Sequence, residues 1–260
     1  MSHSLPVELH GQIAKYVPRR DLTSYMAVSR LTHNEVEREL YRCVDLTHND
    51  TSTFDSLLDG MITAPARTAV VHQFLIEFRG TLPSDLVPKL ATVLRAMSNL
   101  KSLRIDIPRM LLSTILKDCN FQLEHLALWT RWFPPEQDPY LIPFLISQPS
   151  LRRLEFPTCY GDPPPPEALP LLSTLVSEKG MANDMLPNRH IQRLWMTSPR
   201  ARFNSSSPSH LALHVLKLSG SSWELQRPRE ACPNLRLLEL PSQSMLDEVS
   251  CICSTRSYTF

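Results

Sequence analysis

The side chains that most often carry chemistry are present in this chain, but none stands at the spacing of a known site. Among six cysteines only Cys251 and Cys253 are close together, and no second pair follows them to complete a zinc site. His210 and His214 are four residues apart, which suits a metal pair on a helix, yet this segment leads into a predicted strand. We therefore expect no metal site and no cofactor.

The positions of glycine exclude the common phosphate-binding and nucleophile motifs. The six glycines are never closer than 19 residues apart. The GxGxxG, P-loop and GxSxG patterns are therefore all absent. Serine, histidine and carboxylate side chains are plentiful, but none is placed in a strand-turn-helix elbow. We expect no enzymatic activity and assign no catalytic residues.

Charge and hydropathy limit the partners. The net charge is +1, and no basic run is interleaved with aromatic residues, so a nucleic-acid partner is not expected. No apolar run approaches the roughly 18 residues of a membrane span, and residues 1–20 lack the apolar centre of a secretion signal. With its cysteines interpreted as reduced, the protein is expected inside the cell, in the cytoplasm or the nucleus, without a membrane partner.

Residues 5–30 have the pattern of two short amphipathic helices. Leu9 and Ile13 are spaced along one helical face, and Pro18 separates this helix from the next. A third helix is predicted over residues 32–40. Three short helices bury too little surface to be stable alone. Their apolar faces therefore pack either on the rest of the chain or on a partner.

An LxxLxL-like hexamer recurs from residue 41 onward. The copies are YRCVDL at 41, VHQFLI at 71, LKSLRI at 100, LEHLAL at 123, LRRLEF at 151, IQRLWM at 191, LHVLKL at 213 and LRLLEL at 235. Successive copies begin 22 to 30 residues apart, a period typical of leucine-rich repeats, except for a 40-residue gap after residue 151 that would contain an insertion.

The segments between the hexamers carry helical patterns or turn residues. Helices are predicted over residues 84–97, 108–119, 140–147 and 167–178. Strand and helix in alternation predict an α/β fold that coils in a right-handed way around a parallel sheet. Loops are predicted at 131–139, 161–166 and 198–210, and an irregular tail at 250–260. The predicted domains are a helical unit over 1–46 and a repeat domain over 47–249.

Residues 5–46 resemble an F-box, especially its fungal form. The LPVEL opening, the PRRDL turn, the VSR tripeptide and the LYRCVDL exit agree with that family in order and spacing. Many F-boxes have a tryptophan just after the VxR, where this chain has Leu31-Thr32-His33. The repeats that follow resemble the leucine-rich arrays that often accompany fungal F-boxes.

This resemblance implies both a fold and a function. The fold would be a short three-helix F-box followed by a leucine-rich-repeat solenoid, with parallel strands on its concave face and helices and irregular turns on its convex face. The chain would be the substrate-recognition subunit of an SCF-type cullin-RING ubiquitin ligase. It would bind a Skp adaptor through the F-box and an unidentified protein substrate through the repeats. The adaptor-binding residues carried over from the family are Leu5, Pro6, Leu9, Ile13, Leu22 and Val28.

Two alternatives remain open at the level of sequence. One is that the apolar residues of the N-terminal helices pack on the first repeat, with some of them serving both this core and a partner. The other is that the chain is a leucine-rich-repeat interaction scaffold with no ligase role.

Side-chain alternation predicts a recognition surface on the strands. In an LxxLxL strand the third, fifth and seventh residues point outward, because side chains alternate between the two faces of a sheet. Tryptophan and arginine are enriched in binding hot spots. The candidate substrate-binding residues are Arg104, Trp129, Arg153, Arg193, Trp195 and Lys217. The same rule places Asp106, Ala127 and Glu155 outward. The alternative is a solvated face whose charges only keep the sheet soluble.

Overall fold

A computed structural model of the chain describes residues 5–47, 50–78, 82–108, 111–129, 141–156, 163–177, 182, 184–186, 189–197, 212–219 and 232–239. The chain packs as two compact units. One comprises Met1–Leu103 with Thr114–Phe121, and the other comprises Arg104–Ser113 with Gln122–Phe260.

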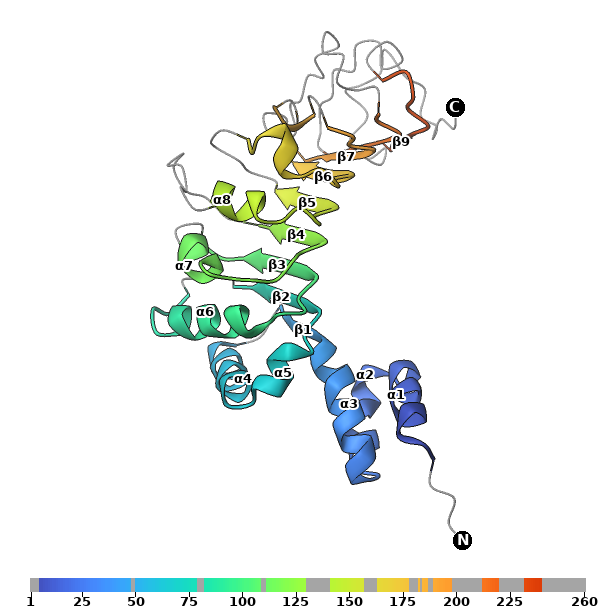
Figure 1. Ribbon diagram of the computed structural model, residues 1–260, viewed down its shortest axis with the longest axis vertical. Helices are drawn as coiled ribbons and strands as arrows, with labels where there is room; N and C mark the ends of the chain where they lie inside the picture. Colours follow the sequence, from blue (N-terminus) through green and yellow to red (C-terminus); the bar gives the residue numbers. More distant parts are fainter. Residues whose placement is uncertain are drawn as a thin grey trace, which may run out of the picture. The chain divides into compact units, whose positions relative to one another are not determined.

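Parallel strands recur throughout the described residues, and their order in the sheet is the order of the chain, from β1 to β9 (Figure 1). They are β1 (Cys43–Leu46), β2 (Gln73–Glu77), β3 (Ser102–Asp106), β4 (His125–Leu128), β5 (Arg153–Phe156), β6 (Thr174–Ser177), β7 (Arg193–Met196), β8 (Val215–Leu218) and β9 (Leu237–Glu239). Such an order arises when every crossover returns the chain to the same edge of the sheet.

The first unit is largely helical. Its helices are α1 (Val7–Tyr16), α2 (Arg19–Met26), α3 (Arg30–Arg42), α4 (Thr51–Thr63), α5 (Pro65–Ala69) and α6 (Leu86–Ala96). In this unit β1 pairs with β2 in parallel, and Val44 is opposite Phe74. The helix α7 (Leu112–Leu116) and strand β3 contain the points at which the chain passes from one unit to the other.

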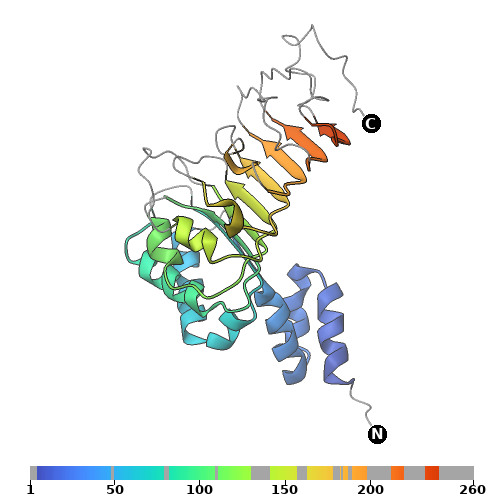
Figure 2. The same cartoon turned by 45° about the horizontal axis from the view of Figure 1, so that its top comes forward.

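Most of the regular structure described in the second unit is sheet. Strands β4 to β9 pair in succession, each parallel to the next, and Figure 2 shows them side by side. Regular helical structure in this unit comprises α8 (Leu141–Ile146) and the short 3₁₀ helix η2 (Pro166–Ala168).

Local chemistry sets the boundaries of the N-terminal helices. Pro18 stands between α1 and α2, where its missing N–H and fixed φ suit a position just before a helix. Ser29 precedes α3 and forms a capping box with Thr32: the Thr32 N–H donates to Ser29 Oγ at 3.1 Å, and the Ser29 N–H donates to Thr32 Oγ1 at 2.8 Å. Both bonds satisfy backbone donors that a helix start leaves without partners.

Ion pairs and ring contacts connect α3 to the first repeats of its unit. Arg67 in α5 reaches Glu37 in α3, with 2.8 Å between Nη2 and Oε1, and its guanidinium lies 5.1 Å from the ring centroid of Tyr41. Because α3 also continues directly into β1, the three N-terminal helices belong to the same compact unit as these repeats.

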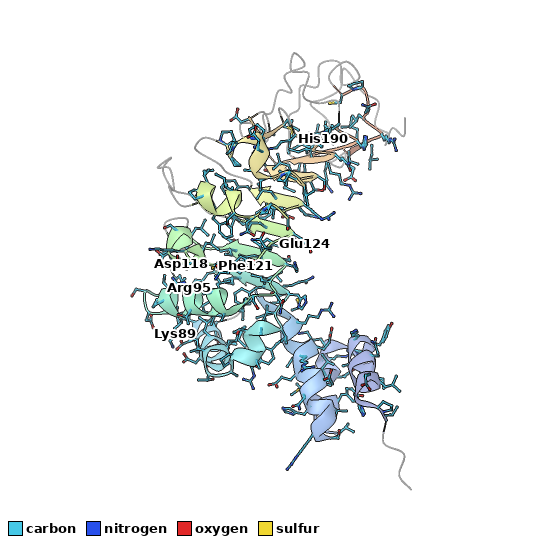
Figure 3. All side chains as sticks on the ribbon, viewed as in Figure 1. Lys89, Arg95, Asp118, Phe121, Glu124 and His190 are labelled. Carbon is cyan, nitrogen blue, oxygen red and sulfur yellow. The ribbon has the colours of Figure 1, made fainter. Side chains whose placement is uncertain are left out.

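Side-chain contacts also fix the helices of the first unit to each other, and Figure 3 labels Lys89 and Arg95, two of the residues that make them. Lys89 in α6 pairs with Asp55 and Asp59 in α4 at 2.5 and 2.8 Å. Arg95 donates from Nε to the carbonyl oxygen of Lys117 at 3.0 Å. Asp118 follows α7 with a φ of 62°, a left-handed conformation that commonly ends helices.

The repeated leucine positions form the core of the array. Apart from the half-buried Tyr41, the described residues at the first, fourth and sixth hexamer positions are almost completely buried, as in Leu123, Leu126 and Leu128 or Leu213, Leu216 and Leu218. All eight hexamers predicted from the sequence contain a strand of the sheet. The prediction of an α/β fold with parallel strands is therefore confirmed.

The helix predicted over residues 167–178 is wrong. Strand β6 lies there instead, between β5 and β7. Pro170 lacks the N–H that a helix interior requires, while Leu172 and Leu175 are buried at the first and fourth repeat positions. Ser177 is buried at the sixth position, where the repeat pattern has an apolar residue. The 40-residue gap therefore contains a further repeat and no insertion.

The other predicted elements differ only in their limits. The helices expected over 84–97, 108–119 and 140–147 are found as α6, α7 and α8. The loop expected over 161–166 is irregular from 163 to 165, and η2 begins at Pro166. The loops predicted at 131–139 and 198–210 and the tail at 250–260 lie outside the described residues, as do Cys251, Cys253 and His210.

Candidate functional site

The three N-terminal helices have a very small core of their own. Ala14 in α1, Leu22 in α2 and Val36 in α3 are buried together, and partly buried apolar side chains from α2, α3 and the residue after α1 pack around them. The ring of His10 adds a contact between α1 and α2, with 3.1 Å between its Nδ1 and the Tyr25 hydroxyl oxygen. This core uses only one side of α1.

The opposite side of α1 presents apolar side chains outward. Leu9, Ile13 and Tyr16 follow one another at helical spacing, so they share one face of the helix. Leu5 and Val28 are also exposed. The exposed fractions are 50% for Leu5, 45% for Leu9, 39% for Ile13, 87% for Tyr16 and 67% for Val28. We call these five residues the apolar stripe. Pro6 is exposed beside them.

Leu22 differs from the other predicted adaptor contacts. Its side chain is only 4% exposed and lies in the small core with Ala14 and Val36. A residue in this position holds α2 against α1 and α3 and is not available to a partner. We therefore assign Leu22 to the core of the three helices and not to the apolar stripe.

Tyr16 is the member of the stripe that sequence reasoning missed. Leu9, Ile13 and Tyr16 are spaced at i, i+4 and i+7, so their side chains share one helical face. The ring of Tyr16 is the most exposed large apolar side chain among the described residues. The helical spacing from Leu9 was the signal that places it on the outer face.

The outward face of the sheet in the second unit carries a series of paired charges. Glu155 accepts from His125 Nε2 at 3.1 Å and from Arg153 Nε at 2.7 Å. Burial acts to raise the pKa of Glu155, but the hydrogen bond from His125 and the charge and hydrogen bonds of Arg153 outweigh it, so this pKa is lowered. Arg153 is therefore engaged by its neighbour on the same strand.

Two of the predicted outward tryptophans hold a cation against their rings. The guanidinium carbon of Arg104 lies 5.5 Å from the ring centroid of Trp129, and Lys217 Nζ lies 4.7 Å from that of Trp195. Trp195 also donates from Nε1 to Ser219 Oγ at 2.8 Å. These contacts fix the two rings on the sheet.

Three residues expected to point outward are buried. Ala127 is covered completely, and Asp106 and Glu155 are 9% and 7% exposed. Alternation does place Glu155 on the outer face, but His125 and Arg153 cover it there. The outer face therefore includes side chains that neighbouring strands cover, in addition to exposed ones.

No group of three or more histidine, cysteine, aspartate or glutamate side chains among the described residues is arranged to hold a metal ion. Burial raises the pKa of the Cys119 thiol to about 12 and that of Cys232 to about 11. In the described part of the chain no helix has both the length and the apolar character of a membrane span.

Strand order and buried leucine positions together define the class of the fold. A parallel strand begins in each repeat, and the next repeat adds its strand beside the last. This is a leucine-rich-repeat type of array, an architecture that offers an extended surface for binding other proteins.

Comparisons with known proteins find similarity to solved structures and not to sequences. No model of a known protein family matches the chain, and no curated protein matches its sequence. Among solved structures, internalin C2 from Listeria monocytogenes aligns with 77% of this chain and 90% of its own, at 13% sequence identity and a TM-score of 0.44.

Proposed function

We propose that this protein is the substrate-recognition subunit of an SCF-type cullin-RING ubiquitin ligase, with the apolar stripe docking on a Skp adaptor and the repeats holding a target protein. The observation that carries the proposal is the stripe itself. Its members Leu9, Ile13 and Val28 stand at positions that the F-box resemblance assigns to adaptor contact, and all are exposed.

The small size of the helical core adds support. Ala14, Leu22 and Val36 are the fully buried apolar residues of this cluster, while large apolar side chains remain in solvent. Several exposed apolar residues along one helix face are typical of a surface that binds a groove on another protein. Docking would bury this face and add to the stability of the three helices.

The repeats supply the second half of the proposal. In an array of parallel strands, each repeat presents an outward side chain at the equivalent position along its strand. A long segment of a target can therefore contact several repeats at once. Arg104, Trp129, Arg153, Arg193, Trp195 and Lys217 all lie on strands of this array or directly after them. In the proposed complex this surface holds the protein to be ubiquitinated.

The second candidate is a leucine-rich-repeat interaction scaffold without a ligase role. The fold of the repeats favours it as much as it favours the ligase subunit, because both use the sheet as a binding surface. The apolar stripe distinguishes the two functions, since a scaffold does not require an exposed apolar face on α1.

Co-purification with a Skp adaptor tests the proposal. The wild-type chain is expected to form a stable complex, and the double variant Leu9→Asp with Ile13→Asp is expected to lose it, because two carboxylates would be buried without partners in the interface. Lys15→Asp is the matched control, since Lys15 is exposed on the same helix but outside the stripe, and it should bind like wild type. Failure of the wild type to bind, or equal binding by the double variant, contradicts the proposal.

A further inference from the structure

Two rows of outward side chains cross strands β6 to β9 in register. The first row consists of the first residue of each strand: Thr174, Arg193, Val215 and Leu237. The other row, which we call the third row, consists of the third residue of each strand: Val176, Trp195, Lys217 and Glu239. Both rows lie on the same face of the sheet, because residues two apart in a strand share a face.

The third row satisfies its own polar groups. Lys217 Nζ lies between the ring of Trp195, 4.7 Å from the centroid, and Glu239 Oε2 at 3.0 Å. The Trp195 indole N–H is used by Ser219 Oγ. Val176 is buried beside them. A ligand that competes for these groups must first break the contacts that they already make.

The first row is open in comparison. Arg193 is exposed, and within the described residues its guanidinium makes no hydrogen bond, ion pair or ring contact. Thr174 and Val215 stand directly beside it on the neighbouring strands, and Leu237 stands beside Val215. All three are partly exposed. The row therefore offers five N–H donors and a hydroxyl at one end and two apolar side chains at the other.

We propose that the first row binds an extended acidic segment of a protein, with one carboxylate on Arg193 and Thr174 and an apolar side chain on Val215 and Leu237. The inference rests on the proposed function only in identifying this segment as part of a ligase target. Neighbouring strands are about 4.8 Å apart, and alternate side chains of an extended chain are about 7 Å apart. The midpoint between Val215 and Leu237 lies one and a half strand spacings from Arg193, about 7 Å, which matches an acidic residue and an apolar residue at i and i+2.

The count of free charges selects a carboxylate over a phosphate. A phosphoryl group carries close to two negative charges at neutral pH and is typically bound by a cluster of arginines. Here the cations nearest to Arg193 along the sheet are already neutralised, Arg153 by Glu155 and Lys217 by Glu239. One free guanidinium matches one carboxylate, to which it can donate two parallel hydrogen bonds.

Selection from a random peptide library displayed on phage, with the full chain as bait, tests this inference. Wild type is expected to enrich peptides with Asp or Glu followed two residues later by an apolar residue. Arg193→Glu should lose the acidic preference. Arg152→Glu is the matched control, because Arg152 is exposed just before β5 and outside both rows, and it should select the same peptides as wild type.

A synthetic copy of the best selected peptide then identifies the anion by fluorescence anisotropy. Replacing its acidic residue with the matching amide should weaken binding to wild type about tenfold, the loss of one charge-assisted contact. Absence of acidic enrichment, or an unchanged profile with Arg193→Glu, overturns the inference. A phosphoserine peptide that binds about tenfold or more tightly than the carboxylate peptide overturns the assignment to a carboxylate.

The same selection separates this inference from the proposed function. The double variant Leu9→Asp with Ile13→Asp is expected to select the same acidic peptides as wild type, because the apolar stripe and the first row are in different units. If the wild type fails to bind a Skp adaptor but still selects acidic peptides through Arg193, the ligase role is wrong and the peptide site stands.

Discussion

Substituting an apolar residue by aspartate has opposite consequences at two neighbouring positions of the N-terminal helices. Leu22 is buried between Ala14 and Val36, whereas Ile13 is 39% exposed in the apolar stripe. We predict that Leu22→Asp unfolds the three helices, whereas Ile13→Asp leaves them folded. The two variants make nearly the same chemical change. A difference in their stability is therefore due to the burial of the substituted position and not to the residue type.

The magnitudes follow from burial. Truncating a buried leucine costs about 2–5 kcal/mol, and leaving a carboxylate without a partner in an apolar core adds roughly 1–3 kcal/mol or more. The sum of about 5 kcal/mol is comparable to the whole stability of many small domains. Complete burial of such an apolar side chain contributes about 1.5–3 kcal/mol to stability. Because Ile13 is only partly buried, Ile13→Asp should lower the free energy of unfolding by only about 1 kcal/mol.

Limited trypsin digestion measures this difference, because Lys15, Arg19 and Arg20 lie in helices that must open locally before they are cleaved. Leu22→Asp is expected to be cut rapidly at these sites, and Ile13→Asp at nearly the wild-type rate. Equal cleavage of both variants would refute the reasoning, since Ile13 would then be a core residue and the stripe would not be a free surface.

Three further predictions concern the repeats. Leu175→Ala in β6 should lower the free energy of unfolding by about 2–5 kcal/mol in urea titrations, as for any fully buried repeat leucine, whereas a loop residue there would show almost no change. Glu155→Gln should lower the free energy of unfolding by about 1–2 kcal/mol at neutral pH. Because the pKa of Glu155 is lowered in the fold, this stabilisation is complete above the ordinary value of 4.5 and is lost as the pH falls through the folded value, so wild type and variant should converge in acid denaturation. Cys232, whose pKa is raised to about 11, should resist iodoacetamide at mildly alkaline pH in mass spectrometry of the folded protein, and rapid alkylation would contradict its burial.

The repeat architecture was predictable because its signal is apolar and periodic. Hexamers such as LEHLAL place leucines at the three positions that the core buries, and all eight predicted copies lie on strands. Strand β6 was missed for a specific reason. Ser177 occupies a buried position that the pattern reserves for an apolar residue, so the hexamer beginning at Leu172 did not match.

The site was predictable in part. Helical spacing identified Leu9 and Ile13 as members of one face, but it did not distinguish which apolar residues close the small core. Leu22 and Ile13 look alike in sequence, and only the packing of the three helices buries the first and leaves the second exposed.

Partners across neighbouring strands were beyond sequence reasoning for the same physical cause. Arg153, Arg193 and Lys217 all follow from alternation as outward cations, but their partners depend on register. His125 of β4 bonds the Glu155 that Arg153 bonds within β5, Lys217 meets Glu239 and the ring of Trp195, and Arg193 stands beside Thr174 and Val215 on either side.

Hydrogen exchange of the full chain with and without a purified Skp adaptor tests the central claim most directly, because it reports where the adaptor binds. The account predicts that added adaptor slows exchange in Val7–Tyr16 and around Val28, while the amides of β6 to β9 exchange as in the free protein. Unchanged exchange throughout the chain, or protection confined to the strands, would contradict the assignment of the apolar stripe as the docking surface.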